Sequence, residues 1–201
     1  MTYDLTTFGE GQLRLTVPSG ARLLNTGVFN LCAAGSEANV AGILAQLGRR
    51  TAWASILPQG GLGDRIMNEY RSAGVDLSQV ARSASGRVAT YYLEPAAGGL
   101  PAKVVYDRDG SPIREARRDD FDWETLLDTR CLFVTGITAA LTEQSAELVR
   151  FAVDAAAARN VSSEVPISSI GSSTNSMMAM DISDMSRERA MPVANCALSL
   201  I

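Results

Sequence analysis

Residues 29–48, FNLCAAGSEANVAGILAQLG, decide the fold of this chain. An apolar run up to Ala34 predicts a strand, Gly35 predicts a tight turn, and Ser36 is expected as the N-cap of a helix. Gly48 predicts a left-handed end to that helix. The apolar residues expected on its buried face follow at helical spacing, namely Val40, Ile43, Leu44 and Leu47.

The turn is a candidate ligand site. Small residues at Ala33, Ala34 and Gly35 leave room for a ligand beside the backbone. The free N–H groups of a first helical turn bind anionic or hydroxyl-bearing atoms, and Asn39 can both donate and accept hydrogen bonds. A tight turn with a purely structural asparagine explains the same residues, so both interpretations stay open at this point.

Outward from the turn, the chain predicts a layered α/β fold. Residues 2–8, 12–17 and 22–31 each have the pattern of a strand, and residues 51–57 form an apolar, β-rich run typical of a buried strand. A strand, the helix carrying Asn39 and a following strand form a unit that favours a right-handed crossover and a parallel sheet. Ligands of such sheets bind at the carboxyl ends of the strands.

The glycine-rich segment at residues 58–63, PQGGLG, opens a second expected helix over residues 64–73. Gly60, Gly61 and Gly63 do not match the G-x-G-x-x-G spacing of a dinucleotide site. The chain also lacks the G-x-x-x-x-G-K-[ST] loop, and Lys103 is its only lysine. Neither common nucleotide fingerprint is present.

A hairpin is predicted from residues 86–94 and 102–108, which the turn-prone PAAGGLP connects. The side chains expected to project from it are those of Tyr91, Tyr92, Tyr106 and Arg108. Phenols beside a guanidinium suit a hydroxylated ligand that carries a carboxylate. A half-buried hairpin face gives the same pattern.

The strand-helix alternation continues through residues 131–134 and a long helix over residues 142–159, capped by Thr142. A parallel strand is due next, but residues 161–201 are rich in serine and methionine, without an aromatic residue or an apolar period. We interpret them as an atypical tail, disordered or from a shifted reading frame, and expect the folded part to end near Asn160.

Composition limits the chemistry. The chain has 201 residues and no histidine, which excludes serine-histidine and cysteine-histidine hydrolysis and histidine-bound metals. Three dispersed cysteines suggest neither a disulfide framework nor a zinc site. The net charge of −4 gives no reason to expect nucleic acid. Without a membrane-length apolar run or a secretion signal, a soluble cytoplasmic protein is expected.

Several motifs, in order, resemble a known family. The segment AAGSEANVAGILAQLG resembles the first signature of the phosphofructokinase-B (ribokinase-like) carbohydrate kinases. Within that family the chain is most similar to 2-keto-3-deoxygluconate kinases, over about residues 3–160. The segments that carry this finer resemblance are GE at residues 9–10, LPQGGLGDR at 57–65, AGVD at 73–76, YYLE at 91–94, VVYDR at 104–108, DFDW at 120–123 and TGIT at 135–138.

The resemblance implies a doubly wound α/β sheet, here incomplete, with a small β lid from about residues 10–31 and 86–108. A sugar acid is the implied small-molecule partner, held between lid and sheet. ATP and Mg are the implied cofactors, and a homo-oligomer through the lid is possible. The implied substrate-binding residues are Gly35 and Asn39 at sugar hydroxyls, Tyr91 and Tyr106 along the pocket, Arg108 at the carboxylate, and Ile137 from the sheet.

The departures from the family matter as much. Its members are roughly half as long again, and their second half supplies a Gly-Ala-Gly-Asp motif whose aspartate takes the proton from the attacking hydroxyl. No such motif occurs in this sequence, so no catalytic residue is assigned. Ala34 also replaces the first glycine of the usual pair.

Two hypotheses remain. In the first, the chain is an ATP-dependent kinase of 2-keto-3-deoxygluconate or a similar sugar, truncated and inactive as it stands. In the second, it is a non-catalytic fragment that binds sugar or dimerises through the lid. Residue types alone do not exclude fructose or ribose as the sugar.

Overall fold

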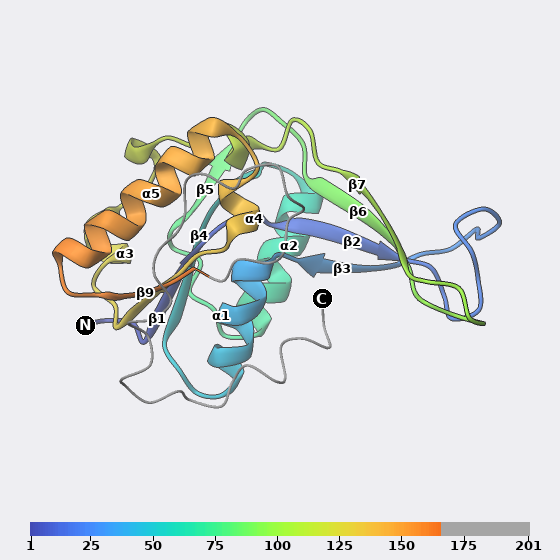
Figure 1. Ribbon diagram of the computed structural model, residues 1–201, viewed down its shortest axis with the longest axis horizontal. Helices are drawn as coiled ribbons and strands as arrows, with labels where there is room; N and C mark the ends of the chain where they lie inside the picture. Colours follow the sequence, from blue (N-terminus) through green and yellow to red (C-terminus); the bar gives the residue numbers. More distant parts are fainter. Residues whose placement is uncertain (166–201) are drawn as a thin grey trace.

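Two β-sheets meet along one edge of the protein (Figure 1). The computed structural model describes residues 1–165. One sheet is parallel, with strand order β5-β4-β1-β8-β9, and the other is mixed, with order β3-β2-β6-β7. We call the mixed sheet the lid, because it extends away from the helices that cover the parallel sheet (Figure 1).

Helices cover both faces of the parallel sheet (Figure 1). Its strands are β1 (Leu5–Phe8), β4 (Thr51–Pro58), β5 (Val80–Ser83), β8 (Cys131–Phe133) and β9 (Ser162–Glu164). Trp53 on β4 packs toward α1 (Ser36–Gln46) and α2 (Gly61–Ser72). Its neighbour Ala54 packs on the other face, among residues of α5 (Glu143–Ala158). Successive side chains of a strand point to opposite faces, so a strand buried along its whole length needs helices on both sides.

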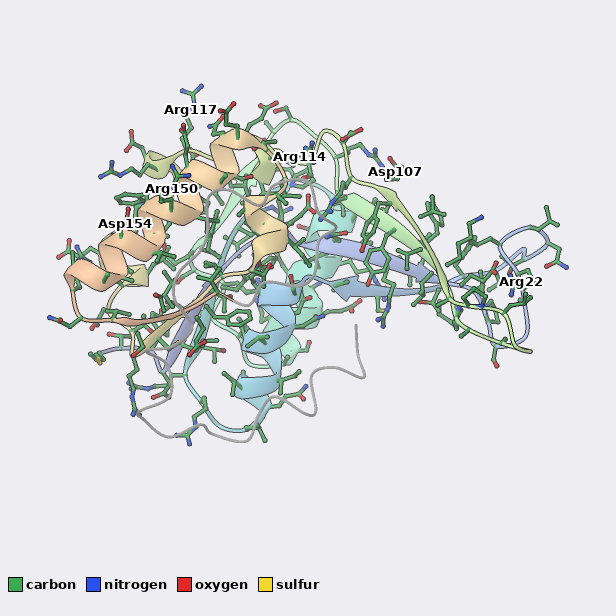
Figure 2. All side chains as sticks on the ribbon, viewed as in Figure 1. Arg22, Asp107, Arg114, Arg117, Arg150 and Asp154 are labelled. Carbon is green, nitrogen blue, oxygen red and sulfur yellow. The ribbon has the colours of Figure 1, made fainter. Side chains whose placement is uncertain are left out.

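Shorter elements complete this unit. They are the 3₁₀ turns η1 (Pro112–Glu115) and η2 (Arg118–Asp120), and the short helices α3 (Trp123–Leu126) and α4 (Gly136–Ala139). Thr142 caps α5 as predicted, accepting a hydrogen bond from the Ser145 N–H. Buried Leu148 and Val149 lie on its inner side, whereas Arg150 and Asp154 are exposed (Figure 2). The doubly wound α/β architecture is therefore confirmed.

The lid contains β2 (Gln12–Thr16), β3 (Asn30–Ala34), β6 (Ala89–Glu94) and β7 (Lys103–Asp107). β2 runs antiparallel to β3 and parallel to β6, and β6 forms the predicted hairpin with β7. Every residue of β7 is exposed. Arg22 lies at the far end of the lid, and Asp107 closer to the parallel sheet (Figure 2).

The third predicted strand is misplaced. Residues 22–29 contain turns, with the Thr26 N–H bonded to the Arg22 carbonyl, and the strand spans only Asn30–Ala34. It also belongs to the lid, so the parallel partner of β4 is β1 and not the strand before α1. All four residues of β1 are buried between the helical layers, whereas β3 begins at an exposed asparagine and suits a sheet with an open face.

Helix α1 buries a different face from the predicted one. Its buried residues are Glu37, Ala38, Ala41 and Gly42, whereas Val40, Ile43 and Leu44 are half-buried and Leu47 is exposed. Small residues let the helix axis approach the sheet closely. The N-cap is Gly35 and not Ser36, while the left-handed end at Gly48 is confirmed by its φ of 79°.

Several short elements, such as β5, α4 and β9, have no counterpart among the expectations drawn from the sequence. The expectation that no strand follows Asn160 is wrong, because β9 pairs in parallel with β8. A three-residue strand needs only an open sheet edge, here supplied by β8, and no apolar period. The other residues assigned to the tail, 166–201, lie outside the described part. Within residues 1–165, none of the helices is both long and apolar enough to cross a bilayer.

Candidate functional site

The carboxyl end of β1 meets the start of α1 and the base of the lid. Gly9 directly follows β1, and a Cβ at this position would overlap the carboxyl group of Glu37. A Cβ on Gly35 would lie 2.6 Å from the Glu10 carbonyl oxygen. Glycine at both positions therefore allows the backbone after β1, the strand-to-helix turn and a buried side chain to share a small volume.

Glu37 is a fully buried acid in the first turn of α1. Its Oε1 accepts hydrogen bonds from the Thr135 and Thr138 hydroxyls, each at 2.6 Å, and from the Thr135 N–H at 3.2 Å. The Ser36 hydroxyl donates to Oε2 at 2.9 Å. Burial raises the pKa of Glu37, and these hydrogen bonds oppose that shift. The side chain ties α1 to the turn between β8 and α4.

Glu10 is the second buried acid at this end of β1, and it binds the lid. The Arg108 guanidinium donates from Nε at 3.1 Å and Nη2 at 2.9 Å, both to Glu10 Oε2. The Ser111 hydroxyl donates to Glu10 Oε1. Arg108 also lies over the Tyr106 ring, with its Cζ 5.0 Å from the ring centroid. Arg108 is thus already ion-paired within the protein.

One row of side chains crosses the lid. Arg14 on β2 pairs in register with Cys32 on β3 and with Tyr91 on β6, and Tyr91 pairs with Tyr106 on β7. Residues in register share a face of a sheet. We call these four residues the lid row. The two tyrosine rings are 5.5 Å apart, centroid to centroid.

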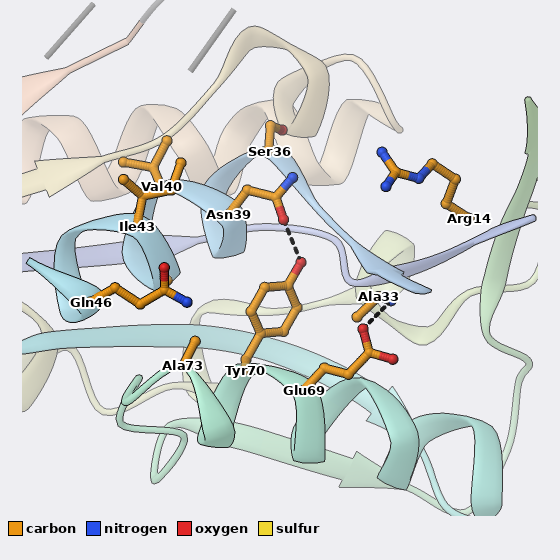
Figure 3. Close-up of a pocket in the computed structure, with 11 residues that line it drawn as sticks. Arg14, Ala33, Ser36, Asn39, Val40, Ile43, Gln46, Glu69, Tyr70 and Ala73 are labelled. Carbon is orange, nitrogen blue, oxygen red and sulfur yellow. Dashed lines mark hydrogen bonds between the residues drawn. The ribbon is translucent and has the colours of Figure 1, made fainter. Parts of the chain in front are cut away.

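A cavity of about 300 Å³ lies between α1, α2 and the lid (Figure 3). Asn39 and Tyr70 face each other in it, and the Tyr70 hydroxyl donates to Asn39 Oδ1 at 2.8 Å. On its α2 wall, Glu69 accepts the Ala33 N–H at 2.7 Å. Arg14 closes the lid side. The residues that line the cavity are Arg14, Ala33, Ser36, Asn39, Val40, Gly42, Ile43, Gln46, Glu69, Tyr70 and Ala73.

The six predicted site residues fall in three places. Asn39 lines the cavity, and Gly35 forms the turn beside it. Tyr91, Tyr106 and Arg108 lie together on the lid. Ile137 is half-buried on α4, between the two threonines that hold Glu37. Arg14 connects the first two places, since it lines the cavity and belongs to the lid row.

Sequence reasoning missed Arg14, Glu37 and Tyr70. Arg14 alternates with apolar residues on β2, a pattern also typical of a solvent-exposed position. Glu37 stands in a first helical turn, where acids are common at the surface. A usable signal was Gly9, whose missing side chain makes room for the carboxyl group of Glu37.

The glycine-rich segment at the start of α2 packs against the end of β4. Across residues 1–165, no three acidic or cysteine side chains gather as a metal site. Gly63, in the glycine-rich segment, packs so closely that a Cβ there would overlap the Pro58 carbonyl oxygen. The absence of a side chain at Gly63 therefore lets α2 pack closely against the end of β4.

Solved structures share this architecture of a parallel sheet with a β lid. The 2-dehydro-3-deoxygluconokinase of Thermotoga maritima superposes with a TM-score of 0.78 at 38% identity, covering 82% of this chain and 50% of that one. A PfkB family carbohydrate kinase from Listeria grayi superposes with a TM-score of 0.74 at 32% identity, over 81% of this chain and 50% of its own. The fold is that of ribokinase-like sugar kinases.

The family follows from sequence comparison. The model of the pfkB family carbohydrate kinases matches residues 8–169, and the chain belongs to this family. It is 35% identical over 159 residues to the 2-dehydro-3-deoxygalactonokinase of Haloferax volcanii, covering 77% of this chain and 50% of that protein. It is 32% identical over 151 residues to the 2-dehydro-3-deoxygluconokinase of Bacillus subtilis, covering 75% and 46%. The chain spans about half the length of these relatives, and the resemblance stated from its motifs is confirmed.

Proposed function

We propose that residues 1–165 form the acceptor-sugar side of a kinase site for 2-keto-3-deoxygluconate or a similar sugar acid. The observation that carries this proposal is the lid row, in which Arg14 lines the cavity that holds Asn39 and lies in register with Tyr91, the partner of Tyr106. Phenol rings bury the carbon skeleton of a sugar, and amide and guanidinium groups hydrogen-bond its oxygens. The similarity to 2-dehydro-3-deoxygluconokinases supports the same substrate class.

Each predicted residue has a role in this proposal. Asn39 donates from Nδ2 to a sugar hydroxyl, because its Oδ1 already accepts from Tyr70. Gly35 lets the sugar approach the start of α1, and Ile137 contacts it from α4. Tyr91 and Tyr106 flank the carbon skeleton. Arg108 reaches the acid with Nη1, the nitrogen that Glu10 leaves free.

Phosphoryl transfer is proposed to need more than these residues. ATP is the proposed donor, and a base must take the proton from the sugar hydroxyl as it attacks the γ-phosphorus. The 201 residues contain no Gly-Ala-Gly-Asp segment. We therefore expect sugar binding without measurable ATP-dependent turnover. A cytoplasmic location belongs to this proposal too.

Calorimetric titration of 2-keto-3-deoxygluconate into the 201-residue protein tests the site. Tyr91→Ala should weaken binding by about 10-fold or more, since it removes a ring from the lid row. Tyr92→Ala is the matched control, because Tyr92 lies on the opposite lid face against Phe29. Equal affinity of both variants, or no binding by the wild type, would reject the site. Turnover in a coupled ATP assay would contradict the expectation that these 201 residues lack the base needed for phosphoryl transfer.

A second candidate function is association of two chains through the lid. It is favoured by the edge strand β7, where Val104, Val105 and Tyr106 are 44%, 41% and 58% exposed. Light scattering after size exclusion should find a dimer that Val105→Glu dissociates. Leu62→Glu, at an exposed position on α2, should leave the dimer intact. A monomeric wild type would end this proposal.

A further inference from the structure

Arg14 is a cation in the cavity wall, and no carboxylate pairs with it in the described part of the chain. Its Nη2 donates to the Cys32 sulfur at 3.2 Å, and its Nε is buried without a hydrogen-bond partner. Thiol sulfur is a weak acceptor, whereas a guanidinium carries five N–H donors. Within residues 1–165, no acid lies within ion-pair distance of Arg14. Arg14 therefore has one buried N–H without a partner and no carboxylate beside its charge.

Glu69 on the cavity wall and Arg108 on the lid are already paired. Glu69, the acid of its wall, forms an ion pair with Arg65 at 2.9 Å and accepts the Ala33 N–H. Arg108 has its Nε and Nη2 on Glu10. That pair of nitrogens is one of the two edges through which a guanidinium binds a carboxylate with two parallel hydrogen bonds. Arg108 therefore offers a ligand only Nη1, with its charge largely balanced.

The position of Arg14 suits a carboxylate that belongs to a hydroxylated molecule. Its guanidinium lies on the side of the cavity nearest Ser36 and Asn39 (Figure 3). Ser36 supplies a hydroxyl there, and Asn39 a free Nδ2. Tyr91, its register partner on β6, completes the surroundings with a phenol. This set of donors and acceptors suits a ligand that carries one anionic group and several hydroxyls.

We propose that Arg14, rather than Arg108, is the principal carboxylate-binding residue of the cavity and selects sugar acids over neutral sugars. This inference rests on the proposed function, since it assumes that the cavity takes a sugar. A carboxylate here would accept two hydrogen bonds from Arg14 and supply the missing countercharge. Arg108 then serves mainly to attach the lid to Glu10.

Calorimetric titrations with two ligands test the proposal. The ligands are 2-keto-3-deoxygluconate and its methyl ester, which keeps the carbon skeleton and removes the charge. Arg14→Gln should weaken binding of the acid roughly 10- to 100-fold, with little change for the ester. Arg108→Gln should cost less for the acid, and Arg49→Gln, at an exposed position after α1, should cost nothing. Circular dichroism verifies that each variant is folded.

The possible results separate this inference from the proposed function. A loss of acid binding in Arg108→Gln but not in Arg14→Gln overturns the inference and leaves the sugar site standing. Equal loss of acid and ester in Arg14→Gln assigns Arg14 a structural role and also overturns it. A wild type that binds neither ligand overturns both proposals. If Arg14→Gln does not fold, Arg14→Lys takes its place, and unchanged acid binding by that variant rejects recognition through the guanidinium.

Discussion

The two sheets of this protein are stabilised in different ways. The parallel sheet is packed between helices on both faces, and all four residues of its central strand β1 are buried. The lid has an edge strand, β7, whose five residues are all exposed, and its side chains pair through rings and charges. Burial of apolar area therefore holds one sheet, while the other leaves polar and aromatic side chains exposed. Stability and the proposed sugar recognition therefore belong to different parts of the chain.

The largest expected effect compares one aromatic residue from each sheet. Phe8→Ala removes a fully buried ring that packs 5.1 Å from Phe121, centroid to centroid, and should lower the free energy of unfolding by about 3–5 kcal/mol. Tyr106→Ala removes a ring that is 58% exposed and should change it by no more than about 0.5 kcal/mol. Urea unfolding followed by circular dichroism measures both. Equal losses would erase the contrast between the two sheets.

A smaller effect tests the close packing at the end of β1. Gly9→Ala places a methyl group on the buried carboxyl group of Glu37 and should cost about 1–3 kcal/mol. Gly27→Ala, in the lid, meets no atom within 4 Å and should change stability by only a few tenths of a kcal/mol. Thermal unfolding of both variants provides the comparison. A neutral Gly9→Ala would mean that Glu37 moves aside at little cost.

The smallest effect is a pH slope caused by Glu37. Because its folded pKa is raised above the ordinary value of 4.5, the native state binds more protons than the unfolded state between these two pKa values. Stability from this group is thus full below a pH of 4.5 and is lost as the pH rises through the folded pKa. Glu37→Gln should unfold with a flatter pH profile, and Glu147→Gln, at an exposed position on α5, with the wild-type profile. A wild type that gains stability relative to Glu37→Gln as the pH rises would show that the hydrogen bonds outweigh burial.

The sequence predicts the parallel sheet better than the lid, for a physical reason. β4 and β8 lie in apolar runs that a buried sheet explains best, and PAAGGLP marks the β6–β7 turn. The sheet to which β3 belongs is decided by pairing with β2, a contact between strands that local pattern does not contain. The same holds for β9, which forms on the edge that β8 offers.

The site was predicted only in part, because its charged residues are recognisable only in three dimensions. Asn39 and the two tyrosines carry ligand-binding groups whatever their surroundings. Glu37 and Arg14 look like surface residues in the sequence. Their importance comes from burial and from the groups beside them, which are hydroxyls for Glu37 and a thiol for Arg14.

Glu10 has a mechanical consequence for the whole molecule. Three of the chain crossings between the two sheets meet at this residue. Glu10 itself lies in the crossing from β1 to β2. Its carbonyl oxygen lies against Gly35, in the crossing from β3 to α1. Its carboxylate binds Arg108 and Ser111, in the crossing from β7 to η1. If the lid tilts while these contacts are kept, it must rotate about Glu10. This makes Glu10 the hinge point between the helix-covered parallel sheet and the part of the lid that carries Tyr91 and Tyr106.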